Sequence, residues 1–426
     1  MYKRQDYDAP ISEAGWTTEK YFLLRDLLRT YLPAGEALPE IPAALPVIEI
    51  PEFHFTKIAP LFSNLPEAKQ TVDIQPMEQF NQGWGTILYR TTLPEAVKSG
   101  TTLKITEVHD WAQIYADGKL LTRLDRRKGE FTTVLPALKK GTQLDILVEA
   151  MGRVNFDKSI HDRKGITEKV ELVSGDRSKE LKNWTVYSFP VDYSFIKNKN
   201  YQDTKILPAM PAYYKTTFKL DKVGDTFLDM STWGKGMVWV NGHAMGRFWE
   251  IGPQQTLFMP GCWLKEGENE ILVLDLKGPV KASIKGLKKP LLDVLREKAP
   301  ETHRKEGEKL KLTGEKVAHE GAFTPGNGWQ EVRFTTPVKG RYFCLEALSP
   351  QANDNIAAIA EFDVLGADGK PVSREHWKIR YADSEETRSG NRTADKIFDL
   401  QESTFWMTVD NVAYPHELVI DLSKVE

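Results

Sequence analysis

This chain of 426 residues lacks the features that mark membrane, disulfide-rich and nucleic-acid-binding proteins. It contains only two cysteines, Cys262 and Cys344, which we expect to be buried free thiols. Its formal net charge is −3 and its pI is about 6.3, so no basic field would hold nucleic acid or an anionic membrane. The sequence shows no apolar run near the roughly 18 residues of a transmembrane helix, and no signal peptide.

Residue patterns for metal binding, phosphate binding and covalent catalysis are also absent from the sequence. The eight histidines include no pair with a metal-ligand spacing such as His-x3-His. The sequence contains no phosphate loop, dinucleotide fingerprint or nucleophile elbow. It therefore implies no cofactor and no metal, and it offers no catalytic constellation.

Few charged residues qualify as catalytic candidates. Glu149 and Glu250 each lack an evident partner, which favours a surface or salt-bridge role. The residues of the pairs His109-Asp110 and His161-Asp162 would point to opposite faces of a strand, which favours structural roles. The acidic run 383–386 is typical of a solvated loop.

One long amphipathic helix is predicted near the N-terminus. Thr17 is the expected N-cap, and the helix is expected to stop at Pro33. An apolar stripe recurs with helical spacing at Tyr21, Leu24, Leu28 and Tyr31, with Leu27 beside it. The stripe has to be buried, yet the next residues form a proline-punctuated extended strap. We therefore interpret the helix as the last piece of a domain whose body is absent.

Short alternating strands dominate the rest of the chain. Asp117-Gly118 and Asn241-Gly242 are hairpin turns, which indicate two similar β-sandwiches in tandem. A short helix is expected at Leu291–Glu297. A third β region follows, with strands expected at Trp329–Phe334, Arg341–Leu345, Glu361–Leu365 and Trp377–Tyr381. The final strand begins at Leu418, and we expect the chain to stop inside a domain.

Several motifs resemble glycoside hydrolase family 35 β-galactosidases. They are Asp6–Gly15 with Thr18–Phe22, Gly83–Thr91, Asp145–Asn155, and the long combination from Asp225 through Trp233-Gly234-Lys235-Gly236 and Val238–Gly242 to Leu257. The resemblance covers nearly the whole chain. It implies a mainly β fold of tandem jelly-roll, galactose-binding-like β-sandwiches, preceded by one remnant barrel helix and a Pro-rich strap.

The resemblance also implies domain boundaries. The implied regions are 1–32, a remnant of the last βα unit of a catalytic (β/α)8 barrel; 33–78, the strap; 79–182, the first sandwich; 183–286, the second, galactose-binding-like jelly roll; 287–314, a linker with a short helix; and 315–426, a discoidin-like sandwich that is permuted or truncated. The discoidin-like segments are 393–399, 404–406 and 414–422. Asp399-Leu400 stands where such modules usually have Asp-Gly, which weakens the inference of a calcium loop.

No catalytic residue is carried over from the family. A retaining mechanism needs two carboxyl groups roughly 5 Å apart, and the resemblance places both glutamates on upstream barrel strands, one of them in an Asn-Glu-Tyr type motif. The only Asn-Glu here, Asn269-Glu270, lies inside a sandwich strand and precedes Ile271. Tyr7 matches a tyrosine that lines the galactose pocket and is the one expected substrate-binding residue.

Three functions remain open from the sequence. The chain is expected to be the accessory part of a retaining exo-β-galactosidase, inactive by itself, with a β-galactoside or glycan as ligand and a catalytic barrel as packing partner. The alternatives are a stand-alone carbohydrate-binding protein acting through the discoidin-like region, and a purely structural array. Family resemblance implies a periplasmic or secreted location. Core or structural roles are favoured over a sugar platform for Trp233, Trp239, Trp249, Arg247, Trp406 and His416.

Overall fold

The computed structural model describes residues 9–155, 160–175, 177–203, 206–297, 300–304, 310–311, 314, 316–326, 328–351 and 354–423. The chain divides into two compact units, residues 1–67 with 189–298 and residues 68–188 with 299–426. The regular secondary structure of the described residues is mainly β-strand, arranged in several antiparallel sheets, which confirms the predicted fold class. Among the described helices, none combines the length and apolar composition that crossing a bilayer requires.

The first unit contains a β-sandwich of a four-stranded and a six-stranded sheet. The smaller sheet has the order β1 (Ile50–His54), β20 (Ser283–Leu287), β15 (Thr226–Asp229), β18 (Thr256–Met259). The larger has the order β13 (Gln202–Asp203), β2 (Lys57–Pro60), β14 (Ala212–Leu220), β19 (Gly267–Asp275), β16 (Lys235–Val240), β17 (His243–Trp249). Residues of both sheets, among them Leu228 and Val238, form one buried apolar core. The short helices α2 (Tyr193–Ile196), η1 (Leu61–Ser63) and η5 (Gly261–Trp263) connect the strands.

The second unit contains a sandwich of the same size. Its smaller sheet has the order β11 (Arg177–Glu180), β10 (Gly165–Ser174), β5 (Thr102–His109), β8 (Thr132–Val134). Its larger sheet has the order β3 (Ala68–Thr71), β12 (Trp184–Phe189), β4 (Gly85–Thr92), β9 (Gln143–Ala150), β6 (Trp111–Ala116), β7 (Lys119–Asp125). The core draws on both sheets and includes the fully buried Trp184. The short helices η2 (Met77–Phe80) and η3 (Arg126–Lys128) lie in its connections.

Both predicted hairpins form. Asp117 and Gly118 join β6 to β7 with φ values of 46° and 78°, and Asn241 and Gly242 join β16 to β17 with 48° and 88°. Two consecutive positive φ values define the two-residue turn whose twist matches the flanking strands. The same turn chemistry therefore places the same structural element in each sandwich.

The predicted Pro-rich strap is extended, but it is more than a strap. Its segments β1 and β2 pair in the first unit with β20 and with β13 and β14, and β3 pairs in the second unit with β12. Prolines are confined to positions such as Pro51 and Pro60 that tolerate a missing backbone donor. The segment thus supplies strands to both sandwiches.

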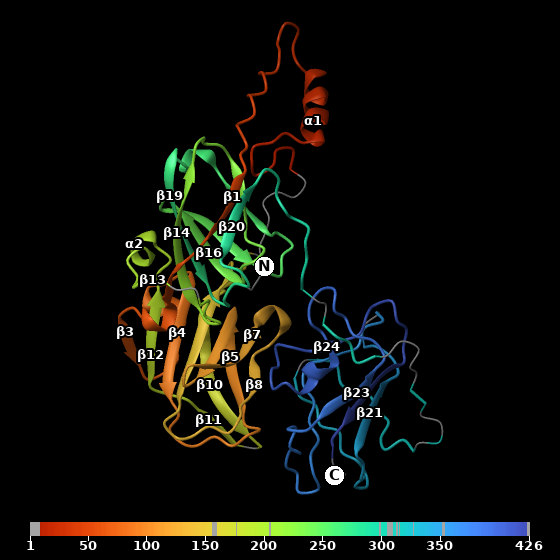
Figure 1. The fold of residues 1–426 in the computed structure, drawn as a ribbon. Coiled ribbons are helices and arrows are strands. Elements are labelled where there is room, and N and C mark those ends of the chain that lie inside the picture. The colour runs from red at the N-terminus through yellow and green to blue at the C-terminus, as the bar shows by residue number, and fades with distance from the viewer. Residues whose placement is uncertain are drawn as a thin grey trace. The chain divides into compact units, whose positions relative to one another are not determined.

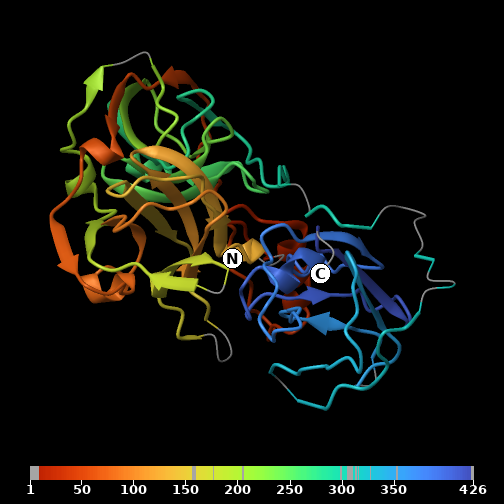
Figure 2. The ribbon, with the colours of Figure 1, turned by 90° about the horizontal axis from the view of Figure 1, so that it is seen from below.

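The C-terminal region of the second unit has a smaller regular framework. One sheet has the order β21 (Tyr342–Ala347), β25 (His416–Asp421), β23 (Lys378–Ala382), and β22 (Ala358–Ile359) pairs with β24 (Trp406–Met407). The short helix η6 (Ala394–Phe398) supplies Ile397 to the apolar core, where Trp377 and Trp406 are also buried. Figures 1 and 2 both show long loops between these elements.

Three elements that were predicted after strand β20 are wrong. Leu291–Glu297 is not helical, because Leu291 accepts from the Gln255 amide at 2.8 Å and Arg296 donates to Ile251 at 2.8 Å instead of bonding within a helical turn. Trp329–Phe334 is exposed and forms no described strand, since its alternation meets no sheet edge. Glu361–Leu365 packs against η6 through the Phe362 amide, 2.6 Å from the Ile397 oxygen, and forms only an isolated bridge at Leu365.

The cysteines are free, as expected, but they are not buried. Cys262 lies in η5 and Cys344 on β21, and both are exposed. Burial alternates along β21, so Cys344 shares the outward face with Tyr342 and Glu346. The general burial tendency of cysteine is therefore overridden by strand register.

The N-terminal helix α1 runs from Glu19 to Arg29, with Thr18 rather than Thr17 at the N-cap. All its residues are described, and none of them is buried. Figure 1 shows it standing apart from the sheets of its own unit. Its exposed apolar side chains, with Tyr31 just beyond its end, are Phe22, Leu23, Leu24, Leu27, Leu28 and Tyr31. The predicted stripe is real and is left uncovered.

Candidate functional site

Of the residues considered as candidates, those of the two His-Asp pairs come together among the described residues. Tyr7, the expected substrate-binding residue, lies outside the described residues. Glu250 forms an ion pair with Lys277, as predicted. Glu149 is buried in β9 with 3% of its surface exposed, so a surface role for it is wrong.

Three tryptophans of the first unit, for which core or structural roles were expected, lie in its interior. Trp233 and Trp239 are 1% and 2% exposed, and Trp249 is 8% exposed. The Lys235 ammonium lies 3.8 Å from the centre of the Trp249 ring, a cation–π contact within the fold. These side chains stabilise the sandwich and offer no open platform on which a sugar could stack.

A buried charge network occupies one corner of the second unit's sandwich. Lys164 is fully buried, and its ammonium lies 2.7 Å from a carboxylate oxygen of both Asp110 and Asp162. The Arg126 guanidinium lies 2.8 Å from Asp110 and 2.6 Å from Asp162. Asp110 also accepts a hydrogen bond from the main-chain amide of Met151 at 2.6 Å, and Asp162 accepts one from that of Val154 at 3.0 Å. The network therefore fixes the backbone that follows β9.

The electrostatics of this network favour two charged carboxylates. Burial alone would raise the pKa of Asp110 and Asp162, but the hydrogen bonds from Lys164 and Arg126 hold both pKa values below the ordinary range. Neither group can serve as a proton donor near neutral pH. Asp110 and Asp162 come from the two His-Asp pairs, and the prediction of a structural role is consistent with this arrangement. The pairs do not lie within strands, however, because each aspartate stands in a connection beside β5, β6 or β10.

The acidic run 383–386 is not a solvated loop. Asp383, Ser384 and Glu385 are 8%, 5% and 6% exposed. Asp383 lies 2.7 Å from Nδ1 of the buried His416, and Glu385 lies 2.8 Å from Nδ1 of His303. The run follows β23 into the core, so each polar group meets a partner there. The expected structural role of His416 agrees with its burial and with these contacts.

Stability of the C-terminal region is expected to depend on the His303–Glu385 pair and to decrease with rising pH. Burial alone would lower the pKa of His303, and the positive charge of Lys396 acts in the same direction. The hydrogen bond with Glu385 and the negative charges of Glu385 and Asp395 outweigh these two effects, so the pKa is raised. A raised folded-state pKa contributes stability below the unfolded value, about 6.5, and this contribution is lost as pH rises through the folded-state pKa.

His303→Asn should therefore remove about 1 kcal/mol of stability at low pH and little at high pH. Thermal melts between about pH 5.5 and pH 9 would measure this, within the range where histidine titrates. His319→Asn, at an exposed position, is the matched control and should leave the profile unchanged. Parallel profiles for wild type and His303→Asn would contradict the expectation.

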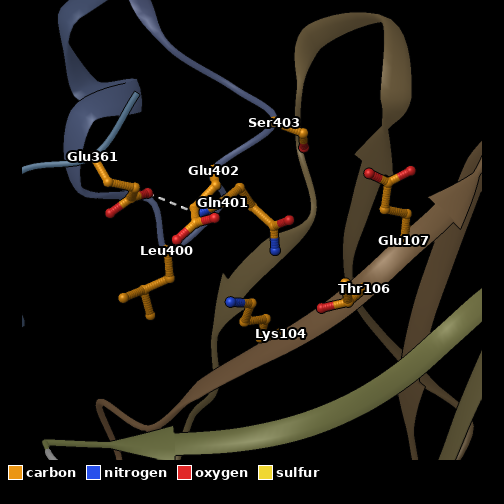
Figure 3. A pocket seen from close by; sticks show the side chains of 8 residues that line it. All are labelled: Lys104, Thr106, Glu107, Glu361, Leu400, Gln401, Glu402 and Ser403. Atoms are coloured by element: carbon orange, nitrogen blue, oxygen red, sulfur yellow. Dashed lines mark hydrogen bonds between the residues drawn. The ribbon is translucent and has the colours of Figure 1, made fainter. Parts of the chain in front are cut away.

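A polar pocket of about 340 Å³ lies within the second unit. Lys104, Thr106 and Glu107 of β5 form one side, and Glu361 with residues 400–403, which follow η6, forms the other. Figure 3 shows the Lys104 and Gln401 side chains directed toward the space between β5 and the loop. The described lining residues include no aromatic ring, so this pocket suits hydrogen bonding rather than stacking.

The carboxyl groups at the loop side of the pocket are held in place. Glu361 forms an ion pair with Arg374 and accepts a hydrogen bond from the main-chain amide of Gln401 at 2.7 Å. Behind it, burial is the main reason that the pKa of Asp399 is raised to about 7, and the neighbouring Glu361 charge acts in the same direction. Thr404 donates to both Asp399 oxygens at 2.9 and 2.8 Å, which opposes the rise. Through these hydrogen bonds, Glu361 and Asp399 position the loop 400–403. Among the described residues, no group of three His, Cys, Asp or Glu could hold a metal ion.

Sequence reasoning missed this pocket. Its two sides are separated by more than 250 positions, and neither side carries a recognisable motif. The one local signal was Leu400, which occupies a glycine-like position after Asp399 and has a φ of 67°. That strained turn presents Gln401 to the pocket.

Family models match both sandwiches. Residues 75–190 match the model described as "Beta-galactosidase, first all-beta domain". Residues 211–269 match the one described as "Beta-galactosidase, galactose-binding domain". These ranges fall on the sandwich of the second unit and on strands β14 to β19 of the first. The two sandwiches are therefore similar to non-catalytic domains of β-galactosidases.

Curated relatives agree with these matches. Beta-galactosidase 1 of Dictyostelium discoideum is 33% identical over 300 residues, covering 63% of this chain and 44% of that protein. The beta-galactosidase of Bos taurus is 33% identical over 344 residues, covering 70% of this chain and 49% of that protein. The chain thus spans less than half the length of these relatives. A solved lectin of Pleurotus ostreatus covers 56% of this chain and 82% of its own, at 13% identity and a TM-score of 0.19, too low to support an argument.

Proposed function

We propose that this chain supplies the accessory β domains of a retaining exo-β-galactosidase of glycoside hydrolase family 35, which removes terminal β-linked galactose from glycans. One observation carries the proposal: the β-galactosidase domain models fall on the two sandwiches that the fold contains. On this proposal, the sandwiches provide the scaffold and the catalytic glutamates reside on a (β/α)8 barrel.

The charge arrangement supports a non-catalytic role. A retaining glycosidase needs an ionised nucleophile and a protonated acid on carboxyl groups roughly 5 Å apart. Asp110 and Asp162 are close together through Lys164, but their shared cations keep both ionised and occupied. Glu361 is likewise engaged by Arg374. These carboxyl groups hold the fold rather than attack a substrate.

Helix α1 supports the proposed packing against a barrel. An apolar helical face normally lies against another element, and that of α1 is exposed along its whole length. On our proposal, a (β/α)8 barrel covers this face. The C-terminal region acts as a discoidin-like carbohydrate-binding module, and the protein works in the periplasm or outside the cell.

The purified chain is expected to show no turnover of a chromogenic β-galactoside. Release of the chromophore would be followed by absorbance over hours at high protein concentration, with an active β-galactosidase as the positive control. Residual activity that survives every carboxylate substitution in the chain would point to a contaminating enzyme. Turnover that disappears when a single carboxylate of this chain is changed would contradict the accessory role.

A further inference from the structure

Strand β21 lies at the edge of the three-stranded sheet in the C-terminal region, and its ladder is regular. Edge strands present unpaired backbone groups, and proteins commonly protect them by short length, lysine, proline or a β-bulge. In the sheets that the structure describes, the edge strands of five or more residues are β1, β7, β17, β21 and β23. The ladders of β1, β7, β17 and β23 each contain a register irregularity, whereas that of β21 contains none. Among these described edges, β21 is therefore the one that no bulge protects.

The free backbone groups of β21 belong to three residues. The Leu422 amide donates to the Arg341 oxygen at 2.9 Å, so these two residues form a hydrogen-bonded pair that continues the ladder between β21 and β25. Hydrogen-bonded pairs alternate along an antiparallel ladder. The N–H and C=O groups of Tyr342, Cys344 and Glu346 therefore point away from β25, and β21 pairs with no other described strand. The side chains of the same three residues are exposed.

The free edge is complementary to a second copy of itself. When two β21 strands pair antiparallel about a twofold axis at Cys344, this residue lies opposite its own copy, and Tyr342 lies opposite Glu346 of the partner subunit. Each of the three pairs then exchanges two hydrogen bonds, so every free N–H and C=O group of these residues is used. The Tyr342 hydroxyl can donate to the opposite Glu346 carboxylate, and no two like charges lie directly opposite each other.

This register uses the edge more fully than its neighbours do. A shift by two residues in one direction places Glu346 opposite Gly340, and a shift in the other direction places Tyr342 opposite Leu348. Both Gly340 and Leu348 lie outside β21, so either shift leaves free groups of the strand without a strand residue to pair with.

We propose that the free edge of β21 pairs with the same edge of a second copy of this chain and forms a twofold dimer. The two three-stranded sheets then join into one continuous sheet. One strand from each copy buries less area than a stable interface usually does, so the dimer is expected to be weak and to depend on protein concentration. This interaction goes beyond the proposed function, because it requires neither a sugar nor a catalytic barrel.

The test measures dimerisation of the full chain by sedimentation velocity over a range of protein concentrations. Every sample carries Leu24→Asp and Leu28→Asp, so that the exposed apolar face of α1 does not contribute. Cys344→Lys places two ammonium groups opposite each other at the twofold axis and is expected to weaken the dissociation constant at least about tenfold. Cys262→Lys, at the other exposed cysteine, is the matched control and should dimerise like its parent.

Hydrogen exchange resolved to single amides identifies the edge that pairs. As protein concentration rises, the amides of Tyr342, Cys344 and Glu346 should exchange more slowly, while those of the bulged edge strand β23 should not change. Cys344→Lys should remove this slowing. It should leave the melting temperature unchanged, because the Cys344 side chain is exposed and its N–H group points away from β25.

The proposal is overturned if the parent is monomeric at every concentration, or if Cys344→Lys leaves the dissociation constant and the exchange of these amides unchanged. If Cys344→Lys lowers the melting temperature, Tyr342→Phe takes its place, since it removes only an exposed hydroxyl. This variant is expected to weaken the dissociation constant at least about fivefold, the worth of one hydrogen bond, and an unchanged constant would overturn the proposal. These failures would leave the accessory role intact, because that role is tested by turnover.

Discussion

Lys164→Met is expected to destabilise the sandwich of the second unit by about 3–5 kcal/mol, the largest stability change that we expect in this chain. The substitution keeps the length of the side chain and removes its charge. Asp110 and Asp162 would then lose the lysine that they share and would keep their contacts with Arg126. Removing one partner of a buried ion pair costs more than the pair contributes, because the remaining charge stays buried and uncompensated.

The position of Lys164 makes this cost hard to avoid. Its side chain is fully excluded from solvent, and its ammonium also donates to the Gly152 oxygen at 3.2 Å. Asp110 and Asp162 are 3% and 1% exposed, so neither carboxylate can turn toward water. The loss therefore extends to the backbone after β9, which these carboxylates hold through the amides of Met151 and Val154.

Urea unfolding followed by tryptophan fluorescence would measure the effect, since Trp184 is buried in the same sandwich. Lys169→Met is the matched control on strand β10: its side chain is 44% exposed and pairs with Glu171 at 3.1 Å. The control should change stability by no more than about 0.5 kcal/mol. Equal effects for Lys164→Met and Lys169→Met would show that the buried network contributes no more to the free energy of unfolding than an exposed ion pair does.

Local turn chemistry explains why the tandem sandwiches could be predicted. Asp117-Gly118 and Asn241-Gly242 need only their own backbone conformation to specify a hairpin, and the alternating strands beside them follow. Helix α1 was predictable for the same reason, because its stripe and N-terminal signal are local. Where an element is specified by its own residues, the sequence is sufficient.

Features that depend on a partner elsewhere in the chain were not predictable. Asp110, Arg126, Asp162 and Lys164 meet only after β5, β6, β7 and β10 are in place. The acidic run 383–386 looked solvated because its partners, His303 and His416, lie far from it or on another strand. Trp329–Phe334 shows the opposite case: its residues alternate as in a strand, but no strand forms. A strand also requires the edge of a sheet that can pair with its backbone groups. Charge and period alone do not reveal whether such a partner exists.

The double substitution Leu24→Asp with Leu28→Asp is expected to abolish association through helix α1. These side chains are 43% and 56% exposed and occupy the centre of the uncovered apolar face. An exposed face of this kind associates with another apolar surface, and in the purified chain the available surface is the same face of a second molecule. Losing two leucines and adding two charges should weaken association by at least about 2 kcal/mol, or roughly thirtyfold in dissociation constant.

Sedimentation velocity over a range of protein concentrations would measure this association. Wild type is expected to form larger species as concentration rises, and the double variant should form none of them beyond the dimer through strand β21. Neither change should lower the melting temperature, because no side chain of α1 is buried in the described helix. Asn198→Asp, which adds a charge at an exposed turn of the same unit, should associate like wild type. If wild type is monomeric at all concentrations, the face is not adhesive, and the proposed packing of α1 against a catalytic barrel loses its main support.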